Sequence, residues 1–253
     1  MSKLTSSTPL HPPRRATDPA YAQVLRPMSK HLQRDMDAIH RDLLSLSAIV
    51  EEMIDKATLS LSAGRKELAA EVIRTDDTVD QREVKIEEEC LKMLALHQPV
   101  AIDLRRVATV LKVNNDLERI ADLAVNIAER SQNIDEYPDF PVPETLSHMV
   151  AIATQMVRSA LDSFVNLDGI AARRIMLMDD DVDRHNREII GELQTLMQER
   201  PDLVPPALHC FSVSRHVERI ADHASNIAED VIYLVEGDII RHRHSTNSPI
   251  LKR

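Results

Sequence analysis

The chain has 253 residues and a formal net charge of −10 at neutral pH, with 31 Lys and Arg against 41 Asp and Glu. This charge argues against a nucleic-acid-binding protein, which needs a basic face to neutralise phosphates. Four Gly, no Trp and 2% aromatic residues disfavour a β-sheet protein, and the length suffices for two units that each bury a core. The composition therefore favours a helical protein whose acidic surface suits cations or basic partners.

Residues 1–30 are rich in Pro, Ser and Thr and show little apolar periodicity. Because such a segment cannot offset its ordering entropy by burial, we expect a flexible tail. No apolar stretch has the length of a signal-peptide core or of a membrane span, about 18 residues, so the sequence favours a cytoplasmic protein. Cys90 and Cys210 lack the spacing of a metal or disulfide motif, and we expect free thiols.

A first unit of three helices is predicted over residues 31–133. Its first helix extends from about His31 to Ser62, and a turn near Gly64 leads to a second helix through Leu94. The third helix follows the break at Pro99, because proline cannot continue the preceding helix. The residues of the first helix that we expect to face inward are Leu43, Leu46, Val50, Met53 and Ala57.

A connection and a second unit follow. The stretch 131–143 carries three prolines and no helical period, and we place the linker itself at residues 134–143. The second unit covers residues 144–238, with a first helix to about Asn166, a turn at Asp168-Gly169 and a second helix to about Glu199. The break ERPDLVPP precedes its third helix, and residues 239–253 form a C-terminal tail.

The two units are copies of each other. The segments Glu118–Glu129 and Glu218–Glu229 are identical at ten of twelve positions, with differences only at Leu123/His223 and Val125/Ser225. In both copies the apolar residues step by three and four, which is typical of an amphipathic helix. These residues are Val110, Val113, Leu117, Ile120, Ala124 and Ile127 in the first copy, and Cys210, Val213, Val217, Ile220, Ala224 and Ile227 in the second. The second helices also correspond at a constant offset, so the sequence predicts an all-α protein of two tandem three-helix bundles.

Each unit carries two carboxylate pairs at i, i+4 spacing. They are Asp76/Asp80 and Glu118/Asp122 in the first unit, and Asp179/Asp183 and Glu218/Asp222 in the second. On the third helices, the carboxylate pairs form a polar stripe opposite the apolar one. In the first copy we expect no Lys or Arg within this polar stripe. Such like-charge pairs cost about 0.2 to 0.5 kcal/mol each. A single pair is more often a solvated helix face than a ligand set, but the duplication favours a surface metal site in which two helices offer four carboxylates.

The donor types limit the metal without choosing it. Oxygen-rich sites suit divalent or trivalent ions such as Mg, Ca, Mn or Fe, whereas Zn usually recruits more His or Cys. His185, His216 and His223 have no counterpart in the first copy, and we expect them to be surface or bundle-edge histidines. Arg215 replaces Asn115 on the acidic stripe, where an ion pair would lower the metal affinity of the second copy.

Two stretches of the chain read HQPVAIDLRRVATVLKVNNDLERIADLAVNIAER and VERIADHASNIAEDVIYLVEGD. They resemble signatures of the PhoU family of phosphate-specific transport system accessory proteins, and the likeness extends from about residue 30 to 240. The segment Gln98 to Arg105, the doubled E-R-I-x-D motif and the three-helix spacing occur together and in order. One departure is that Ala121 and Ala221 stand where the family usually has glycine, which removes no ligand.

The resemblance implies two three-helix bundles related by pseudo-twofold symmetry, often assembled as homodimers, with metal ions or clusters held by E(D)xxxD motifs. Here those motifs are Asp76/Asp80, Glu118/Asp122, Asp179/Asp183 and Glu218/Asp222. It also implies a regulator of phosphate uptake and phosphate-starvation signalling rather than an enzyme. Such a protein links the ATPase subunit of a phosphate ABC importer to a sensor histidine kinase, contacts the membrane only through these partners, and holds signalling off when phosphate is ample.

Two other interpretations remain open on the residues alone. A ferritin-like di-metal carboxylate protein also places Glu and Asp on helices, but that architecture expects inward-facing Glu-x-x-His motifs, and none occurs in this chain. A purely structural helical adaptor explains the amphipathic helices but not the duplicated like-charge pairs. The chain contains no P-loop, G-x-S-x-G or H-E-x-x-H motif, which agrees with a protein that is not an enzyme.

Overall fold

The structure is a computed structural model that describes residues 29–63 and 65–237. All regular structure in these ranges is helical, which confirms the all-α prediction. The elements are α2 (Lys30–Ala63), α3 (Lys66–His97), α4 (Ala101–Ile134), α5 (Glu144–Asn166), α6 (Gly169–Glu199), the short 3-10 helix η1 (Pro201–Leu203) and α7 (Val204–Glu236). The expected tails, 1–30 and 239–253, lie outside the described residues except for residues 29 and 30, the second of which already begins α2.

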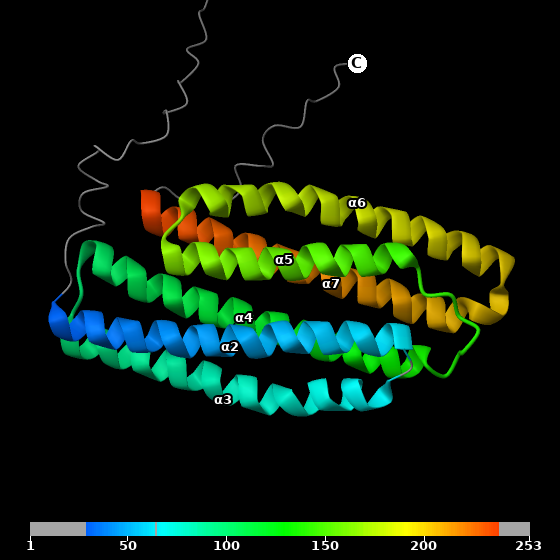
Figure 1. Ribbon diagram of the computed structural model, residues 1–253, viewed down its shortest axis with the longest axis horizontal. Helices are drawn as coiled ribbons and strands as arrows, with labels where there is room; N and C mark the ends of the chain where they lie inside the picture. The colour runs from blue at the N-terminus through cyan, green and yellow to red at the C-terminus, as the bar shows by residue number, and fades with distance from the viewer. Residues whose placement is uncertain (1–28, 64, 238–253) are drawn as a thin grey trace, which may run out of the picture.

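The six long helices form two three-helix bundles that lie side by side along a common long axis (Figure 1). One bundle contains α2, α3 and α4, and the other contains α5, α6 and α7. The bundles meet where α4 packs against α7 and α2 packs against α5. The helices that carry the duplicated sequence are therefore direct neighbours, as a pseudo-twofold relation between the two units requires.

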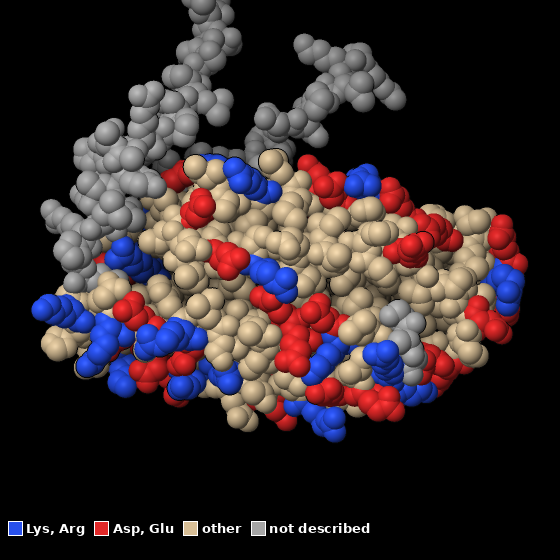
Figure 2. Space-filling view, viewed as in Figure 1, with Lys and Arg blue, Asp and Glu red and all other residues tan. Residues whose placement is uncertain are grey.

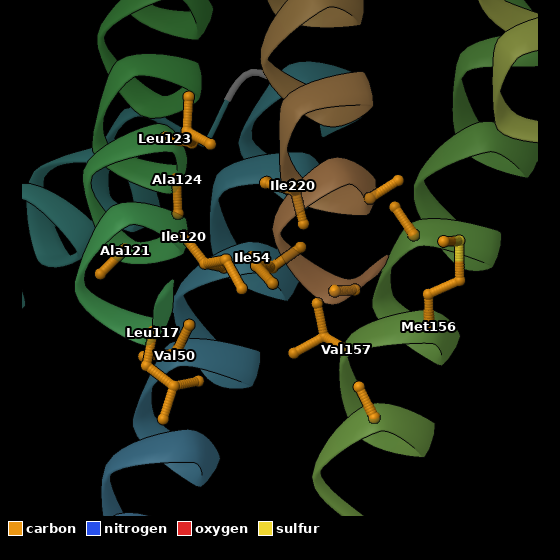
Figure 3. Close-up of a cluster of buried hydrophobic side chains, with 14 of the residues drawn as sticks. Val50, Ile54, Leu117, Ile120, Ala121, Leu123, Ala124, Met156, Val157 and Ile220 are labelled. Carbon is orange, nitrogen blue, oxygen red and sulfur yellow. The ribbon is translucent and has the colours of Figure 1, made fainter. Parts of the chain in front are cut away.

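A single hydrophobic core runs through both bundles. Every residue of the stripes predicted to face inward on α2, α4 and α7 is buried. Figure 3 shows where the bundles join: Ile54 of α2, Ile120 of α4 and Ile220 of α7 belong to one cluster, with Val157 of α5 beside it. Because each fully buried aliphatic side chain contributes about 1.5 to 3 kcal/mol, this shared core holds the two bundles together as one body.

Local sequence explains where most of the helices begin and end. At the predicted turn, the Asp168 side chain accepts hydrogen bonds of 2.9 Å from the backbone N–H groups of Ile170 and Ala171, which caps α6. α3 ends at Gln98, whose φ of 42° is left-handed and whose N–H donates to the Leu94 carbonyl. Pro99 then prevents the helix from continuing.

Two boundaries differ from the prediction. α4 continues to Ile134, past residue 131, because the buried Ser131 hydroxyl donates to the Ala128 carbonyl and lies 2.6 Å from the Ser60 hydroxyl of α2. α7 begins at Val204, inside the predicted break, because Pro205 and Pro206 fall in its first turn, where no backbone donor is needed. Among the described helices, none is long and apolar enough to cross a membrane.

Candidate functional site

The predicted carboxylate pairs come together along two helix contacts. α3 packs against α4, and α6 packs against α7. We call Asp76, Asp80, Glu118 and Asp122 the first acidic seam, and Asp179, Asp183, Glu218 and Asp222 the second acidic seam. Each seam therefore joins one pair from a second helix with one pair from a third helix, as the sequence predicts.

In the first acidic seam, burial and neighbouring charges act in the same direction. The pKa of Asp76 is raised, first by burial and then by the charges of Asp80 on its own helix and Asp122 on α4. The pKa of Glu118 is raised by burial and then by the charge of Asp122. The carboxylates of the two helices therefore share one negative field, which disfavours the ionised forms and favours a bound cation.

The second acidic seam shows the same effect more strongly at one residue. Burial, followed by the charges of Asp222 and Asp183, raises the pKa of Asp179 to about 6, although the Ser225 hydroxyl donates to it at 3.4 Å. The pKa values of Glu218 and Asp222 are also raised, in both cases chiefly by burial. A cation bound beside these carboxylates would stabilise their ionised forms.

The seams are less exposed than the sequence suggests. Asp80, Asp183 and Asp222 are exposed, but the other five carboxylates are half-buried. The expectation of solvated stripes opposite the apolar face was wrong because α4 and α7 each pack against their own bundle and against each other. Helices held in this way have little fully solvated face left.

Each seam contains one arginine, although we expected no cation in the first. Arg119 lies 3.3 Å from Glu118 and 3.2 Å from Asp122, so the sequence argument from stripe positions was wrong here. Arg215 pairs with Glu218, as predicted for the second copy. The Arg119 side chain is 52% exposed, and such pairs contribute at most about 1 kcal/mol, so an incoming cation could replace the arginine at low cost.

Sequence reasoning missed one acidic residue of this region. Glu83 of α3 has a raised pKa and contributes to the field at Glu118. Its backbone carbonyl and its carboxylate both accept from the Asn114 amide, at 2.9 and 3.1 Å, which ties α3 to α4. The corresponding residue in the second unit is the buried Asn186. This difference between the two copies could have indicated from the sequence that Glu83 has a role of its own. The first seam therefore carries the larger negative charge.

The residues of the seams suit a hard cation in charge and in donor type. Carboxylate oxygens are the ligands that Mg, Ca, Mn and Fe accept, and the raised pKa values of Asp76 and Glu118 mark a local excess of negative charge. Within residues 29–63 and 65–237, no three His, Cys, Asp or Glu side chains are already arranged as a ligand set. Binding therefore requires side-chain rotation, which the exposed Asp80 can undergo freely.

One histidine of the second copy lies between the two bundles. His223 of α7 is half-buried and lies 2.8 Å from Asp116 of α4, so it connects the two bundles instead of lying at an open edge. Beside it, Lys112 of α4 pairs at 2.9 Å with Asp230 of α7, whose side chain is 2% exposed. These contacts between the bundles were not predicted. The difference between Leu123 and His223 in the duplicated segment could have indicated that position 223 has a partner outside its own unit.

Comparison with known proteins identifies the family. The PhoU domain model matches residues 43–131 and 146–231, once in each bundle. The chain is 41% identical to the PhoU homolog of Aquifex aeolicus over 213 residues, which is 84% of this chain and 96% of that protein. The homolog from Pseudomonas aeruginosa is 36% identical over 85% of this chain and 89% of its own length. Both are named phosphate-specific transport system accessory proteins.

Solved structures agree with the sequence comparison. The crystal structure of PhoU from Pseudomonas aeruginosa superposes with a TM-score of 0.78 and 35% identity, covering 81% of this chain and 99% of that chain. The PhoU structure from Streptococcus pneumoniae also gives a TM-score of 0.78, at 27% identity, and covers 83% of this chain and 99% of its own. The chain therefore belongs to the PhoU family.

Proposed function

We propose that this protein regulates phosphate uptake and represses phosphate-starvation signalling when phosphate is ample. One observation carries the proposal: both halves of the chain match the PhoU domain in order, and the relatives that cover most of it are named accessory proteins of the phosphate-specific transport system. The match includes both bundles, so the whole two-bundle body is the regulatory unit.

The regulator acts as an adaptor in the cytoplasm between the ATPase subunit of the phosphate importer and a sensor histidine kinase. It reaches the membrane only through these partners, and it binds no nucleic acid, for which its acidic charge is unsuited. A non-catalytic role is supported by the two thiols. Cys90 and Cys210 are buried, and burial raises the pKa of each to about 12, so neither can serve as a nucleophilic thiolate.

The acidic seams bind divalent or trivalent metal ions in this proposal. An arginine pairs with a carboxylate in each seam, but the first seam is the stronger site because Glu83 adds to its negative field, whereas the second unit has Asn186 at that position. The metal neutralises the carboxylates and so changes the charge of the surface offered to partners.

A ferritin-like di-metal oxidase finds no support. That architecture holds its metals inside the bundle with Glu-x-x-His motifs. Here the carboxylates lie along outer helix seams, half-buried or exposed, and the bundle interior is hydrophobic.

Deletion of the gene tests the proposal. Without the protein, phosphate-starvation genes should be expressed even in phosphate-rich medium, and the full chain supplied from a plasmid should repress them again. A deletion strain that keeps normal repression at high phosphate would contradict the proposal. Reporter expression is read in the same strain before and after complementation, so a second-site change can be recognised.

A further inference from the structure

The connection between the bundles forms a surface with two grooves at one end of the molecule, where α4 leads into α5 (Figure 1). The first groove has a volume of about 490 Å3 and is lined by residues of α4 and of the connection, with Leu61 of α2. The second groove, of about 420 Å3, lies between the connection and the C-terminal part of α6. Val142 and Pro143 line both grooves. We call this surface the linker face.

The two grooves differ in what they offer to an incoming side chain. The accessible lining of the first is mostly polar, and its apolar members Ile134 and Phe140 are only 4% and 7% exposed. The accessible lining of the second is mostly apolar and includes the half-buried Leu196. The second groove is therefore the one suited to an aliphatic side chain of a partner.

The linker face is rigid before anything binds. Pro138, Pro141 and Pro143 restrict its backbone, and the Tyr137 N–H donates to the Ile134 carbonyl at 2.9 Å. The Thr145 hydroxyl donates to Glu192 at 3.0 Å, which fastens the start of α5 to α6. A surface that is already ordered loses little conformational entropy on binding.

Acidic residues surround both grooves. The first is bordered by Asp135 and Glu144 and the second by Glu192 and Glu199, while Glu136 and Asp139 are exposed along the connection. The sequence contains no Lys or Arg between Arg130 and Arg158. Figure 2 shows acidic side chains, with some basic ones among them, around uncharged surface at this end of the molecule. Of the basic side chains, Lys66 pairs with Asp135 of this border and Arg200 pairs with Asp202.

We propose that the linker face binds a segment of another protein in which aliphatic side chains alternate with lysine or arginine. An aliphatic side chain fills the second groove beside Val142 and Leu196, and the cations meet the acidic border of both grooves. The ring of Tyr137, which lines the first groove between Asp135 and Glu144, adds a surface on which a guanidinium or ammonium group can stack. This inference deepens the adaptor role proposed above by giving the chemistry of one partner surface.

A second copy of the chain is a poor occupant of this surface. A twofold contact places the same patch on both subunits, so the acidic border of one linker face would meet that of the other. Like charges across an interface are unfavourable, whereas a cationic partner meets charges of opposite sign.

Binding of a labelled peptide to the full chain tests the proposal. The probe is a synthetic amphipathic peptide of Leu and Lys, and the comparison peptide has every Lys replaced by Glu. Fluorescence anisotropy should show that the Leu/Lys peptide binds and that the Leu/Glu peptide does not. The triple variant Glu144→Gln, Glu192→Gln and Glu199→Gln should weaken binding of the Leu/Lys peptide about tenfold, with a smaller dependence on salt.

A matched variant separates the linker face from general charge attraction. Glu87→Gln, Glu88→Gln and Asp162→Asn remove the same charge from exposed positions elsewhere, and they should weaken binding less than twofold. Leu196→Ser should weaken binding about fivefold, because it removes an aliphatic contact from the second groove. Thermal unfolding of each variant verifies that the bundles remain folded.

Three results would overturn the proposal. One is equal weakening by the two charge-neutralising triples, and another is full binding by Leu196→Ser. The third is that the linker-face triple variant, and not the control triple, changes the self-association of the chain measured by light scattering. That result would show that a second copy of the chain occupies the surface. The deletion phenotype is independent of the peptide measurement, so failure here would leave the proposed regulatory role standing.

Discussion

At the scale of the residue, Asp179 gives the second acidic seam a pH-dependent stability. Its pKa in the folded protein is raised from 3.8 to about 6, so the folded state holds this proton more tightly than the unfolded chain does. The contribution of Asp179 to the free energy of unfolding is therefore full below about pH 4 and is lost as the pH rises through about 6. Because the side chain is only half-buried, solvent screening limits the loss to about 1 kcal/mol.

We expect Asp179→Asn to raise the free energy of unfolding of the metal-free protein at pH 7 by about 1 kcal/mol and to flatten its dependence between pH 4 and 6. Urea unfolding at a series of pH values in the presence of a chelator measures both effects. Glu88→Gln, at an exposed position of α3 in the other bundle, is the control and should change neither. Parallel pH profiles for the wild-type chain and Asp179→Asn would contradict the assignment.

The sequence predicted the seam carboxylates and the pairing of Arg215, but not the local partners in the first seam. The i, i+4 spacing fixes which side chains share one face of a helix, and so Glu118 and Asp122 could be paired without a structure. The position of the Arg119 guanidinium depends on the rotamers of a long side chain, which sequence spacing does not determine. Glu83 was missed because its role arises from the packing of α3 on α4 through Asn114.

At the scale of the element, the contact between α3 and α4 should bind metal as a unit. We expect the replacement of Asp76, Asp80 and Asp122 by Asn, together with Glu118→Gln, to abolish metal binding in the first seam. The variant should stay folded, with stability unchanged or raised, because each like-charge pair costs about 0.2 to 0.5 kcal/mol. Elemental analysis of the purified protein measures the loss.

The matching replacements in the second seam provide the control. Their effect on metal content should be smaller, because the second seam has Asn186 where the first gains the charge of Glu83. Metal content that is undiminished in both variants would place the metal elsewhere in the protein.

The helices were predicted better than their ends. Apolar periodicity fixed the buried stripes of α2, α4 and α7, because burial of a continuous stripe dominates the stability of a helix in a bundle. The end of α4 depends on one contact between Ser131 and Ser60 of another helix, which no local pattern reveals. The start of α7 was placed too late because Pro205 and Pro206 were assigned to the break before the helix, whereas they lie in its first turn.

At the scale of the whole molecule, we expect the protein to form a homodimer, as its relationship to the PhoU family suggests. Light scattering should give a mass near twice the 28.6 kDa of one chain. The linker-face triple variant should keep this mass, because a twofold contact there would join two acidic surfaces. A mass of one chain at every concentration tested would contradict the predicted homodimer and show that the protein is a monomer.

The ion pairs between α4 and α7 carry a consequence for the history of the chain. A single ancestral unit could have paired with a copy of itself, as α4 now pairs with α7. At an offset of 100 residues, however, Asp230 corresponds to Arg130 and His223 corresponds to Leu123. Two first halves would place Lys112 against an arginine and leave Asp116 facing leucine. We therefore expect an isolated first half to pair poorly with itself, because its contact residues complement those of the second half and not its own.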